Sequence, residues 1–314
     1  MKALVVDFGG SHAGCGLVED DRLLATEKIE IGSAVRLREV LPRIAESFRR
    51  LLADRATAAG SCEGVAMGLP SIVDARTGKV LDSRSKYTDA MGIDLVEWSR
   101  NEFGLSLRAE NDARLALLGE SFTGAARGCS NVIMMTLGTG IGGTAMIEGK
   151  LLRGRHSQAG CLGGHLPVLF DGRRCMCGAI GCAEAEGSSW ALPLIARDWN
   201  GISGSKLAPL VERLNFEQLF EEADSGDAVA CEIRGRCLNV WSVAAIAMVH
   251  AYDPEILVMG GGVMRREAEI VPYVQKYLDA HAWTEWGKVQ VKAARLGNDA
   301  ALLGAVPLLL EKFD

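Results

Sequence analysis

The amino-acid sequence predicts an α/β protein made of two similar halves. A length of 314 residues suits two domains, because domains usually contain roughly 100–200 residues. One pattern of apolar segments and glycines occurs twice, at residues 3–24 and again at residues 132–152, without a gap until its last turn. In both halves, short apolar segments of strand length are followed by segments with helical periodicity, which is typical of α/β folds.

The first half is expected to begin with a β-hairpin. Residues 3–6 and 15–18 are apolar runs of strand length on either side of a glycine turn. Residues 38–53 repeat apolar side chains at helical spacing, which predicts an amphipathic helix. Pro42 is tolerated there near the first turn or as a kink. Further strands are expected at residues 65–69 and 105–109, followed by a helix that reaches residue 120.

The second half repeats this hairpin and then continues with helices. The apolar runs at residues 132–135 and 144–147 flank the second glycine turn. Helices are expected at residues 216–223 and 228–250, a strand at 255–259, and an apolar helix at 300–310. We therefore expect an N-terminal α/β domain over residues 1–118, completed by the C-terminal helix at 300–314, and a C-terminal α/β domain over residues 119–299.

Charge and composition exclude several classes of function. Lys plus Arg is 34 and Asp plus Glu is 40, a formal net charge of −6, so no overall basic field exists to hold a nucleic acid. The longest apolar region, at residues 238–249, is interrupted by Asn239 and Ser242, and no apolar stretch of signal-peptide length opens the chain. We expect a soluble, cytoplasmic protein with no nucleic-acid or membrane partner.

Three of the nine cysteines lie close together in the second half and indicate a metal site. Their spacing from a histidine is His-x9-Cys-x-Cys-x4-Cys, and four such nitrogen and sulfur ligands suit a closed tetrahedral zinc site. The alternative is a surface loop with unligated cysteines, but the polar and glycine-rich surroundings leave little core to bury them. With all four positions filled by protein, the zinc would be structural. The expected ligands, in a loop over residues 165–182, are His165, Cys175, Cys177 and Cys182.

The two glycine turns follow apolar strands and suit the binding of phosphate. Backbone N–H groups without a neighbouring side chain can approach phosphate oxygens closely, and Asp7 at a strand end can hold a hydrated magnesium ion. A plain hairpin turn is the alternative for either turn alone. The occurrence of two turns at matching positions favours the phosphate interpretation. The residues concerned are Asp7, Gly9, Gly10 and Ser11 in the first turn, and Gly138, Thr139 and Gly140 in the second.

Acidic residues elsewhere are candidates for catalysis and binding. Asn111 and Asp112 lie where a predicted strand gives way to a predicted helix, so either can simply be a helix N-cap. The functional alternative is that Asp112 acts as a general base on an attacking hydroxyl. Glu184 follows Cys182 closely, so a zinc loop would hold it rigidly; a solvated surface glutamate is the alternative.

Six motifs, taken in order along nearly the whole chain, resemble the ROK family of bacterial sugar kinases and repressors. This resemblance implies an actin-like, RNase H-like duplicated two-domain fold with a central cleft, and a homodimer. It also implies ATP- and magnesium-dependent phosphorylation of a hexose or N-acylhexosamine, commonly at the 6-hydroxyl. The motifs are DFGGS at Asp7, ENDA at Glu110, LGTGIGG at Leu137, CMCGAIGCAE at Cys175, MGGGV at Met259 and LGNDAALLGA at Leu296.

The resemblance also implies roles for individual residues. Asp112 matches the catalytic base, while Asn111, His165 and Glu184 match contacts to the sugar. The zinc ligands match those expected from the cysteine spacing. The residues that match the nucleotide loops are Gly9, Gly10, Gly138, Thr139, Gly140, Gly261 and Gly262.

The chain also departs from the family pattern. Leu162 stands three residues before the motif histidine, where a sugar-binding glutamate is usual, and residues 83–94 replace the common sugar loop. We hypothesise that Lys86, Tyr87 or Asp89 compensates within that loop. A non-catalytic, sugar-sensing protein is therefore an alternative to a kinase. A repressor is disfavoured, since an N-terminal glycine turn this early leaves no room ahead of it for a DNA-binding segment.

Overall fold

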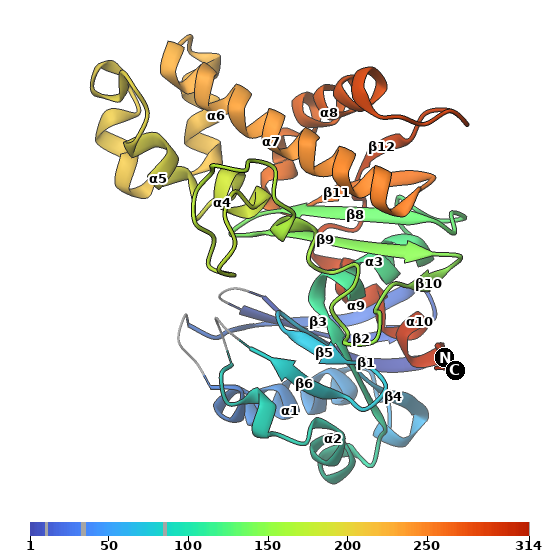
Figure 1. The fold of residues 1–314 in the computed structure, drawn as a ribbon. Coiled ribbons are helices and arrows are strands. Elements are labelled where there is room, and N and C mark those ends of the chain that lie inside the picture. Colours follow the sequence, from blue (N-terminus) through green and yellow to red (C-terminus); the bar gives the residue numbers. More distant parts are fainter. Residues whose placement is uncertain (10–11, 33–35, 84–86, 314) are drawn as a thin grey trace. The chain divides into compact units, whose positions relative to one another are not determined.

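A computed structural model describes residues 1–9, 12–32, 36–83 and 87–313 of the chain. It contains two compact units, each built around its own sheet (Figure 1). The α/β class and the duplicated organisation expected from the sequence are confirmed. Unit 1 comprises Met1–Cys129, Lys150–Cys161 and Ala294–Asp314, and unit 2 comprises Ser130–Gly149 and Leu162–Ala293.

The sheet of unit 1 has five strands in the order β3-β2-β1-β4-β7. The first three strands form an antiparallel meander, and β4 and β7 run parallel to β1. The predicted hairpin is thus confirmed, and a third strand extends it. The strands are β1 (Lys2–Phe8), β2 (His12–Glu19), β3 (Arg22–Glu30), β4 (Cys62–Leu69) and β7 (Leu107–Asn111), with a separate two-stranded sheet of β5 (Ile72–Asp74) and β6 (Lys79–Asp82).

The sheet of unit 2 has the same strand order, β10-β9-β8-β11-β12. Here β8 and β9 form the antiparallel hairpin, while β11 runs parallel to both β8 and β12. The repeat in the sequence therefore corresponds to a repeat in topology. The strands are β8 (Val132–Leu137), β9 (Ile141–Ile147), β10 (Lys150–Leu151), β11 (Ile256–Gly260) and β12 (Gln290–Ala293).

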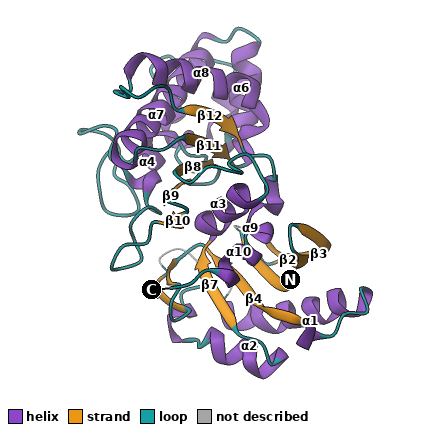
Figure 2. Ribbon diagram, turned by 90° about the vertical axis from the view of Figure 1, so that its right-hand side faces the viewer, coloured by secondary structure: helices purple, strands orange, loops and turns teal. Residues whose placement is uncertain are grey.

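Helices cover both faces of the unit 1 sheet (Figure 2). On one face, α1 (Leu37–Asp54) and α2 (Leu95–Phe103) pack against the strands, and α1 buries the apolar side chains that the sequence places on one helical face. On the other face lie α3 (Asp112–Phe122), α9 (Ala300–Leu303) and α10 (Ala305–Leu310). Because α3 follows β7 directly, the residues at this junction are held by a strand on one side and a helix on the other.

The prediction of a single apolar helix at residues 300–310 is wrong, because the structure has two short helices separated by a turn at Gly304. Pro307 has no backbone N–H to donate to the carbonyl of Leu303, so one hydrogen bond of a continuous helix is missing there. Close packing adds a second reason. A side chain at Gly304 would collide with the carbonyl oxygen of Leu115 in α3, so the turn lies directly against that helix.

The contact between α3 and α9 predicts a large effect of one methyl group. A Cβ atom at Gly119 would collide with the backbone of Ala300, and neither helix backbone can move cheaply. We expect Gly119→Ala to lower the free energy of unfolding by about 3 kcal/mol or more. Gly235→Ala is the matched control: it lies within α7 (Ala228–Tyr252) in open space and should raise stability by up to about 1 kcal/mol. Equal urea midpoints for the two variants would contradict this packing.

The remaining helices lie in unit 2. Two of them begin with clear N-caps: Asn215 forms a capping box with Gln218 at α6, and Asp227 caps α7. Both helices were expected from the sequence and are confirmed. The helices are α4 (Ala183–Gly187), α5 (Leu192–Arg197), α6 (Phe216–Asp224), α7 (Ala228–Tyr252) and α8 (Glu267–His281).

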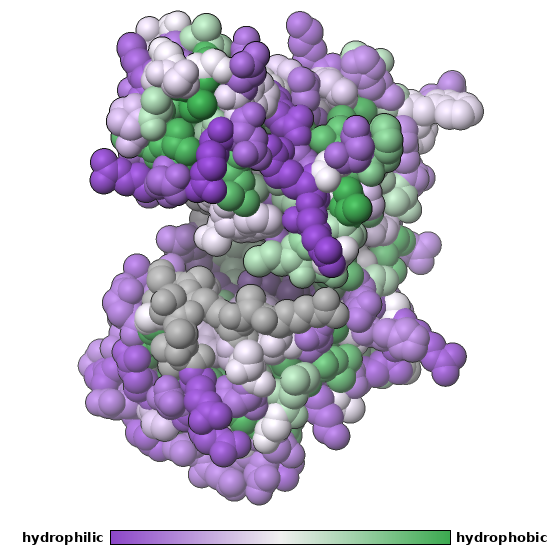
Figure 3. Space-filling model, turned by 60° about the vertical axis from the view of Figure 1, so that its left-hand side comes forward, coloured by the Kyte–Doolittle hydropathy of each residue, from purple (hydrophilic) through white to green (hydrophobic). Residues whose placement is uncertain are grey.

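The surface in Figure 3 is largely hydrophilic, and its apolar residues occur in small separate groups. Within the described ranges, none of the helices combines the length and the apolar character that a membrane crossing requires.

Candidate active site and metal centre

In unit 1, the carboxyl ends of three parallel strands bring two aspartates together. Asp7 on β1 is paired in register with Gly68 on β4, and Asp112 follows the end of β7. A Cβ atom at Gly68 would lie 2.9 Å from Asp7 Oδ1 and 3.7 Å from the Cα atom of Asp112. Ends of parallel strands are common ligand sites in α/β sheets. Glycine at position 68 therefore leaves room for both acidic residues.

Local hydrogen bonds fix the orientation of Asp112. Its Oδ1 accepts hydrogen bonds from the backbone N–H of Ala113 (2.8 Å) and from Asn111 Nδ2 (3.0 Å). Burial nevertheless raises the pKa of the Asp112 carboxyl to about 6, while these hydrogen bonds act in the opposite direction. A carboxylate with a pKa in this range is suited to accept a proton near neutral pH.

Asn111 is the N-cap of α3. Its Oδ1 accepts a hydrogen bond from the backbone N–H of Arg114 at 3.2 Å, so the capping interpretation of this residue is confirmed. Its Nδ2 is shared between Asp112 and the carbonyl of Ser71. The cap thus connects the start of the helix to the orientation of Asp112.

Asp7 is a buried carboxyl with unused hydrogen-bonding capacity. Its Oδ1 is buried and has no hydrogen-bond partner among the residues that the structure describes. Burial, and next the charge of Asp112, raise the pKa of Asp7 to about 8. Mg²⁺ prefers carboxylate oxygens, so an orphaned oxygen beside a second carboxyl fits the magnesium site expected at Asp7.

The first glycine turn can be compared with its prediction only in part. Gly10 and Ser11 lie outside the described residues. Gly9 donates a backbone hydrogen bond to the carbonyl of His12 at 2.9 Å, as expected in a hairpin turn.

The second glycine turn is held by the segment that follows the cysteines. The backbone N–H groups of Ser189 and Trp190 donate to the carbonyls of Gly138 (3.0 Å) and Thr139 (3.1 Å). Glu184 on α4 accepts a hydrogen bond from the backbone N–H of Ile141 at 3.0 Å. The conformation of this turn in unit 2 is therefore coupled to α4.

A cavity of about 560 Å³ in unit 2 includes parts of two of the three predicted nucleotide loops. Gly138 and Thr139 line it from the β8–β9 turn, and Gly262 lines it from the turn after β11. Gly261 has a φ of +93°, and a side chain there would collide with the backbone of Leu137. Glycine is therefore required where the turn after β11 approaches the end of β8. Gly140 and Gly261 do not line the cavity directly.

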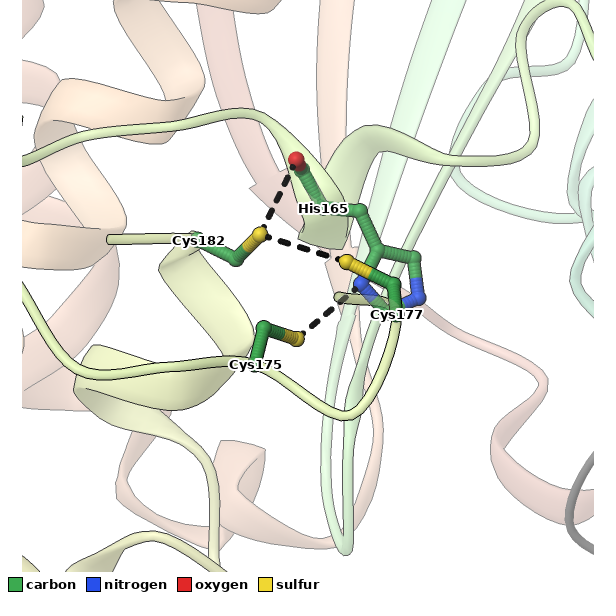
Figure 4. A group of neighbouring side chains, drawn as sticks. All are labelled: His165, Cys175, Cys177 and Cys182. Carbon is green, nitrogen blue, oxygen red and sulfur yellow. Dashed lines mark hydrogen bonds between the residues drawn. The ribbon is translucent and has the colours of Figure 1, made fainter. Parts of the chain in front are cut away.

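The four expected metal ligands lie together (Figure 4). Their ligand atoms are all within 4.8 Å of one another. Cys175 Sγ lies 3.5 Å from His165 Nδ1, and Cys177 Sγ lies 3.6 Å from Cys182 Sγ. One imidazole nitrogen and three thiolates are a common ligand set for structural zinc, so these residues fit a zinc ion.

Glu186 anchors the cysteine loop and was missed by the sequence analysis. It is completely buried and accepts hydrogen bonds from the backbone N–H of Arg173 and from the guanidinium groups of Arg173 and Arg236. Its only sequence signal is two glutamates close to Cys182, which does not reveal their burial. Because Arg236 belongs to α7, this ion-pair network connects the cysteine loop to the longest helix of unit 2.

Glu184 is buried, so the alternative of a solvated surface glutamate is wrong. Besides Ile141, it accepts a hydrogen bond from Trp190 Nε1 at 3.4 Å. In His165, Nδ1 faces the cysteines while Nε2 points away from them (Figure 4). One nitrogen of this residue can therefore bind metal while the other donates to a ligand.

The loop over residues 83–94 carries the three residues that were expected to compensate for the missing sugar-binding glutamate. Lys86 lies outside the described residues. The Asp89 carboxylate accepts hydrogen bonds from the backbone N–H groups of Leu37 (2.8 Å) and Arg38 (3.1 Å) at the start of α1. Both of its oxygens therefore already have a partner. Tyr87 is 2% exposed, and its hydroxyl has no hydrogen-bond partner in the described part of the chain. Of the two candidates that the structure describes, Tyr87 is the one with an unused polar group.

Comparison with known proteins gives the family. The family model described as "ROK family" matches residues 3–312. A glucokinase of Thermotoga maritima is 32% identical over 319 residues, which covers 99% of this chain and 98% of that enzyme. The chain belongs to the ROK family, on its sugar kinase branch.

Solved structures agree with this assignment. A ROK family glucokinase from Streptomyces griseus, in complex with glucose and AMPPNP, is 29% identical with a TM-score of 0.78, covering 98% of this chain and 99% of that one. A ROK hexokinase from Thermus thermophilus is 27% identical with a TM-score of 0.80, covering 98% and 97%. The actin-like hexokinase fold expected from the motifs is confirmed.

Proposed function

We propose that the protein transfers the γ-phosphoryl group of ATP to a hydroxyl of a hexose or hexose derivative, at the 6-position. The observation that carries this proposal is Asp112, a partly buried carboxyl with a pKa of about 6 after the end of β7, oriented by Asn111 and beside Asp7. The relationship to a glucokinase that binds glucose and an ATP analogue supports it.

Asp112 acts as the general base in this proposal. Its ionised carboxylate accepts the proton of the sugar hydroxyl as that oxygen attacks the phosphorus atom. Asn111 contacts the sugar and keeps the carboxylate in position. Most of the rate enhancement then comes from positioning and electrostatics.

Asp7 would hold Mg²⁺ with its unpartnered carboxylate oxygen. The ion supplies charge neutralisation for the phosphate oxygens when it is bound. In the free protein, burial and next the repulsion from Asp112 disfavour ionisation of Asp7, which raises the pKa of Asp7. A cation at this position would relieve that repulsion.

The glycine turns of unit 2 provide the phosphate contacts. Phosphate oxygens can approach the backbone closely at Gly140, Gly261 and Gly262, which carry no side chain, and next to Thr139 in the β8–β9 turn. Gly138 shapes this turn, because its backbone N–H donates to the carbonyl of Gly140 at 3.0 Å. A cavity of about 560 Å³ lies against these turns and is in the usual size range for a small-molecule ligand, roughly 300–1,000 Å³.

We also propose that the zinc site supports sugar binding. His165 is both a metal ligand and a candidate sugar contact through Nε2. Glu184, two residues after Cys182, holds the β8–β9 turn through Ile141 and is a further candidate contact. Zinc would brace the loop that carries both residues.

Tyr87 is the residue of the unusual loop that we propose to compensate for the glutamate missing at Leu162. Its backbone has a φ of +55°, which is uncommon for a residue other than glycine. Burial, and next the charge of Asp7, raise the pKa of its phenol to about 12. The phenol therefore stays protonated and can donate a hydrogen bond to a sugar oxygen.

Tyr87→Phe should weaken sugar binding without weakening the fold. Removing a buried, unpaired hydroxyl should leave the free energy of unfolding unchanged or raise it by about 1 kcal/mol, while KM for the sugar rises about tenfold. Tyr273→Phe is the matched control, because its hydroxyl donates to Asn239 at 2.8 Å. That variant should lose about 1 kcal/mol of stability and keep its KM. Thermal unfolding and sugar titrations check both, and an unchanged KM in Tyr87→Phe would refute its role.

A sugar-sensing protein without turnover is the second candidate, favoured by Leu162, which is 39% exposed where the family has a glutamate. ADP release with ATP and Mg²⁺, measured across hexoses, hexosamines and N-acylhexosamines, separates the two. Sugar-dependent ADP release supports the kinase. Sugar binding without any ADP release supports the sensor.

The homodimer and the cytoplasmic location expected for this protein stay predictions.

A further inference from the structure

The cavity of about 560 Å³ in unit 2 has walls of different chemistry. One wall consists of the glycine turns at Gly138 and Gly262. Acidic side chains line the cavity from α6: both Glu217 and Glu221 belong to this lining. These two residues are four positions apart, so they share one face of the helix.

The negative charges on α6 are not compensated by neighbouring side chains. Glu217 and Glu221 are exposed, and neither forms an ion pair with any residue that the structure describes. Two carboxylates at this spacing repel each other modestly. Glu217 lies in the first turn of α6, where a negative charge favours the helix dipole. Glu221 has no such role, since it neither caps the helix nor pairs across it.

Two arginines line the same cavity from the 3₁₀ helix η6 (Gly262–Arg266), but only one is available. Arg266 is ion-paired with Asp224, and its guanidinium lies 5.1 Å from the centre of the Phe220 ring. Arg265 is exposed and has no acidic partner within the described ranges. The cavity thus offers one uncommitted cation, three residues beyond Gly262.

We infer that this cavity selects the phosphoryl donor, and that Glu217 and Glu221 determine its specificity. The inference rests on the proposed kinase function. Phosphates bind at the glycine turns and Arg265, where backbone N–H groups donate hydrogen bonds to phosphate oxygens and the guanidinium balances their negative charge. The two carboxylates accept hydrogen bonds from vicinal hydroxyls, as acidic residues do with ribose in dinucleotide sites. The donor that fits is a nucleoside triphosphate.

The same two carboxylates exclude a different donor. An inorganic polyphosphate chain ends in the same transferable phosphoryl group, but its negative charge repeats along the whole chain. Any such chain that follows the cavity past the glycine turns meets Glu217 and Glu221. Like charges brought together in this way disfavour the wrong ligand. The carboxylates therefore attract one donor and repel the other.

The test compares two donors at saturating sugar: ATP and long-chain inorganic polyphosphate. In the double variant Glu217→Gln and Glu221→Gln, we expect KM for ATP to rise about tenfold with kcat retained, and kcat/KM for polyphosphate to rise. Arg265→Gln should instead weaken both donors. The control variant, Glu63→Gln with Glu97→Gln, removes the same charge from exposed residues of unit 1 and should change neither donor.

The outcomes separate this inference from the proposed function. An unchanged ratio of ATP to polyphosphate efficiency in the double variant overturns the inference, as does a wild-type protein that uses polyphosphate as well as ATP. Absence of turnover with either donor contradicts the kinase function instead. Calorimetric binding of AMPPNP then decides the inference by itself: tenfold weaker binding in the double variant supports it, and equal binding overturns it.

Discussion

Replacing Asp112 with asparagine should lower sugar-dependent ADP release by a factor of about 10²–10⁴, the usual contribution of a general base. Asparagine has nearly the same shape, so the hydrogen bonds that its Oδ1 accepts from Ala113 and Asn111 can persist. The loss should therefore appear in kcat while KM for the sugar changes little. Steady-state kinetics with the best sugar of the panel gives both values.

Asp54→Asn is the matched control, because Asp54 is an exposed aspartate at the end of α1. It should retain wild-type kcat, and both variants should unfold cooperatively. Residual turnover of Asp112→Asn within a few-fold of wild type would show that another group accepts the proton.

The same assignment gives the pH dependence. Burial raises the pKa of Asp112 to about 6, and a base works only in its ionised form. For wild type, kcat/KM for the sugar should fall as the pH drops through about 6, roughly tenfold per pH unit below it, and level off above it. A profile that is flat from pH 5 to 7 would contradict the assignment.

Removal of zinc should have the second largest effect. Cys182→Ser or strong chelation should release one metal ion per chain, lower the midpoint of thermal unfolding and raise KM for the sugar, because the loop from His165 to Glu184 loses its brace. ATP affinity should also fall, since Glu184 holds the β8–β9 turn through Ile141. Metal analysis, thermal unfolding and titrations with sugar and AMPPNP check each part.

Cys129→Ser is the control for the zinc prediction, because Cys129 belongs to unit 1 and lies outside the cysteine cluster. It should keep its zinc, its stability and its KM. Protein prepared with available zinc that contains no stoichiometric metal, yet binds sugar normally, would contradict the proposed role of the site.

Much of the fold could be predicted because the repeat is explicit in the sequence. The two hairpins and the strands β4, β7 and β11 are marked by apolar runs beside glycines. The zinc ligands could be predicted for a similar reason, since all four lie within one short loop. The break at Gly304 could be predicted only in part: Pro307 is visible in the sequence, but the close contact of Gly304 with Leu115 joins residues that are far apart in the chain.

The sequence pattern also did not predict which charged residues are buried. Glu110 and Arg114 are both completely buried and form an ion pair. Arg114 also donates to backbone carbonyls of Leu152 and Ser157, and Arg153 donates to Glu110 at 2.6 Å. These contacts hold the segment Lys150–Cys161 within unit 1. In a linear sequence the same residues look like ordinary surface charges, because their partners are brought together only by folding.

The most direct measurement is the identity of the product formed from ATP, Mg²⁺ and each sugar of the panel, by mass spectrometry alongside ADP release. We predict one sugar phosphate for every ADP released with at least one hexose or hexose derivative, and loss of both products in Asp112→Asn. Sugar binding without any phosphorylated sugar across the panel would contradict the kinase function and favour the sensor.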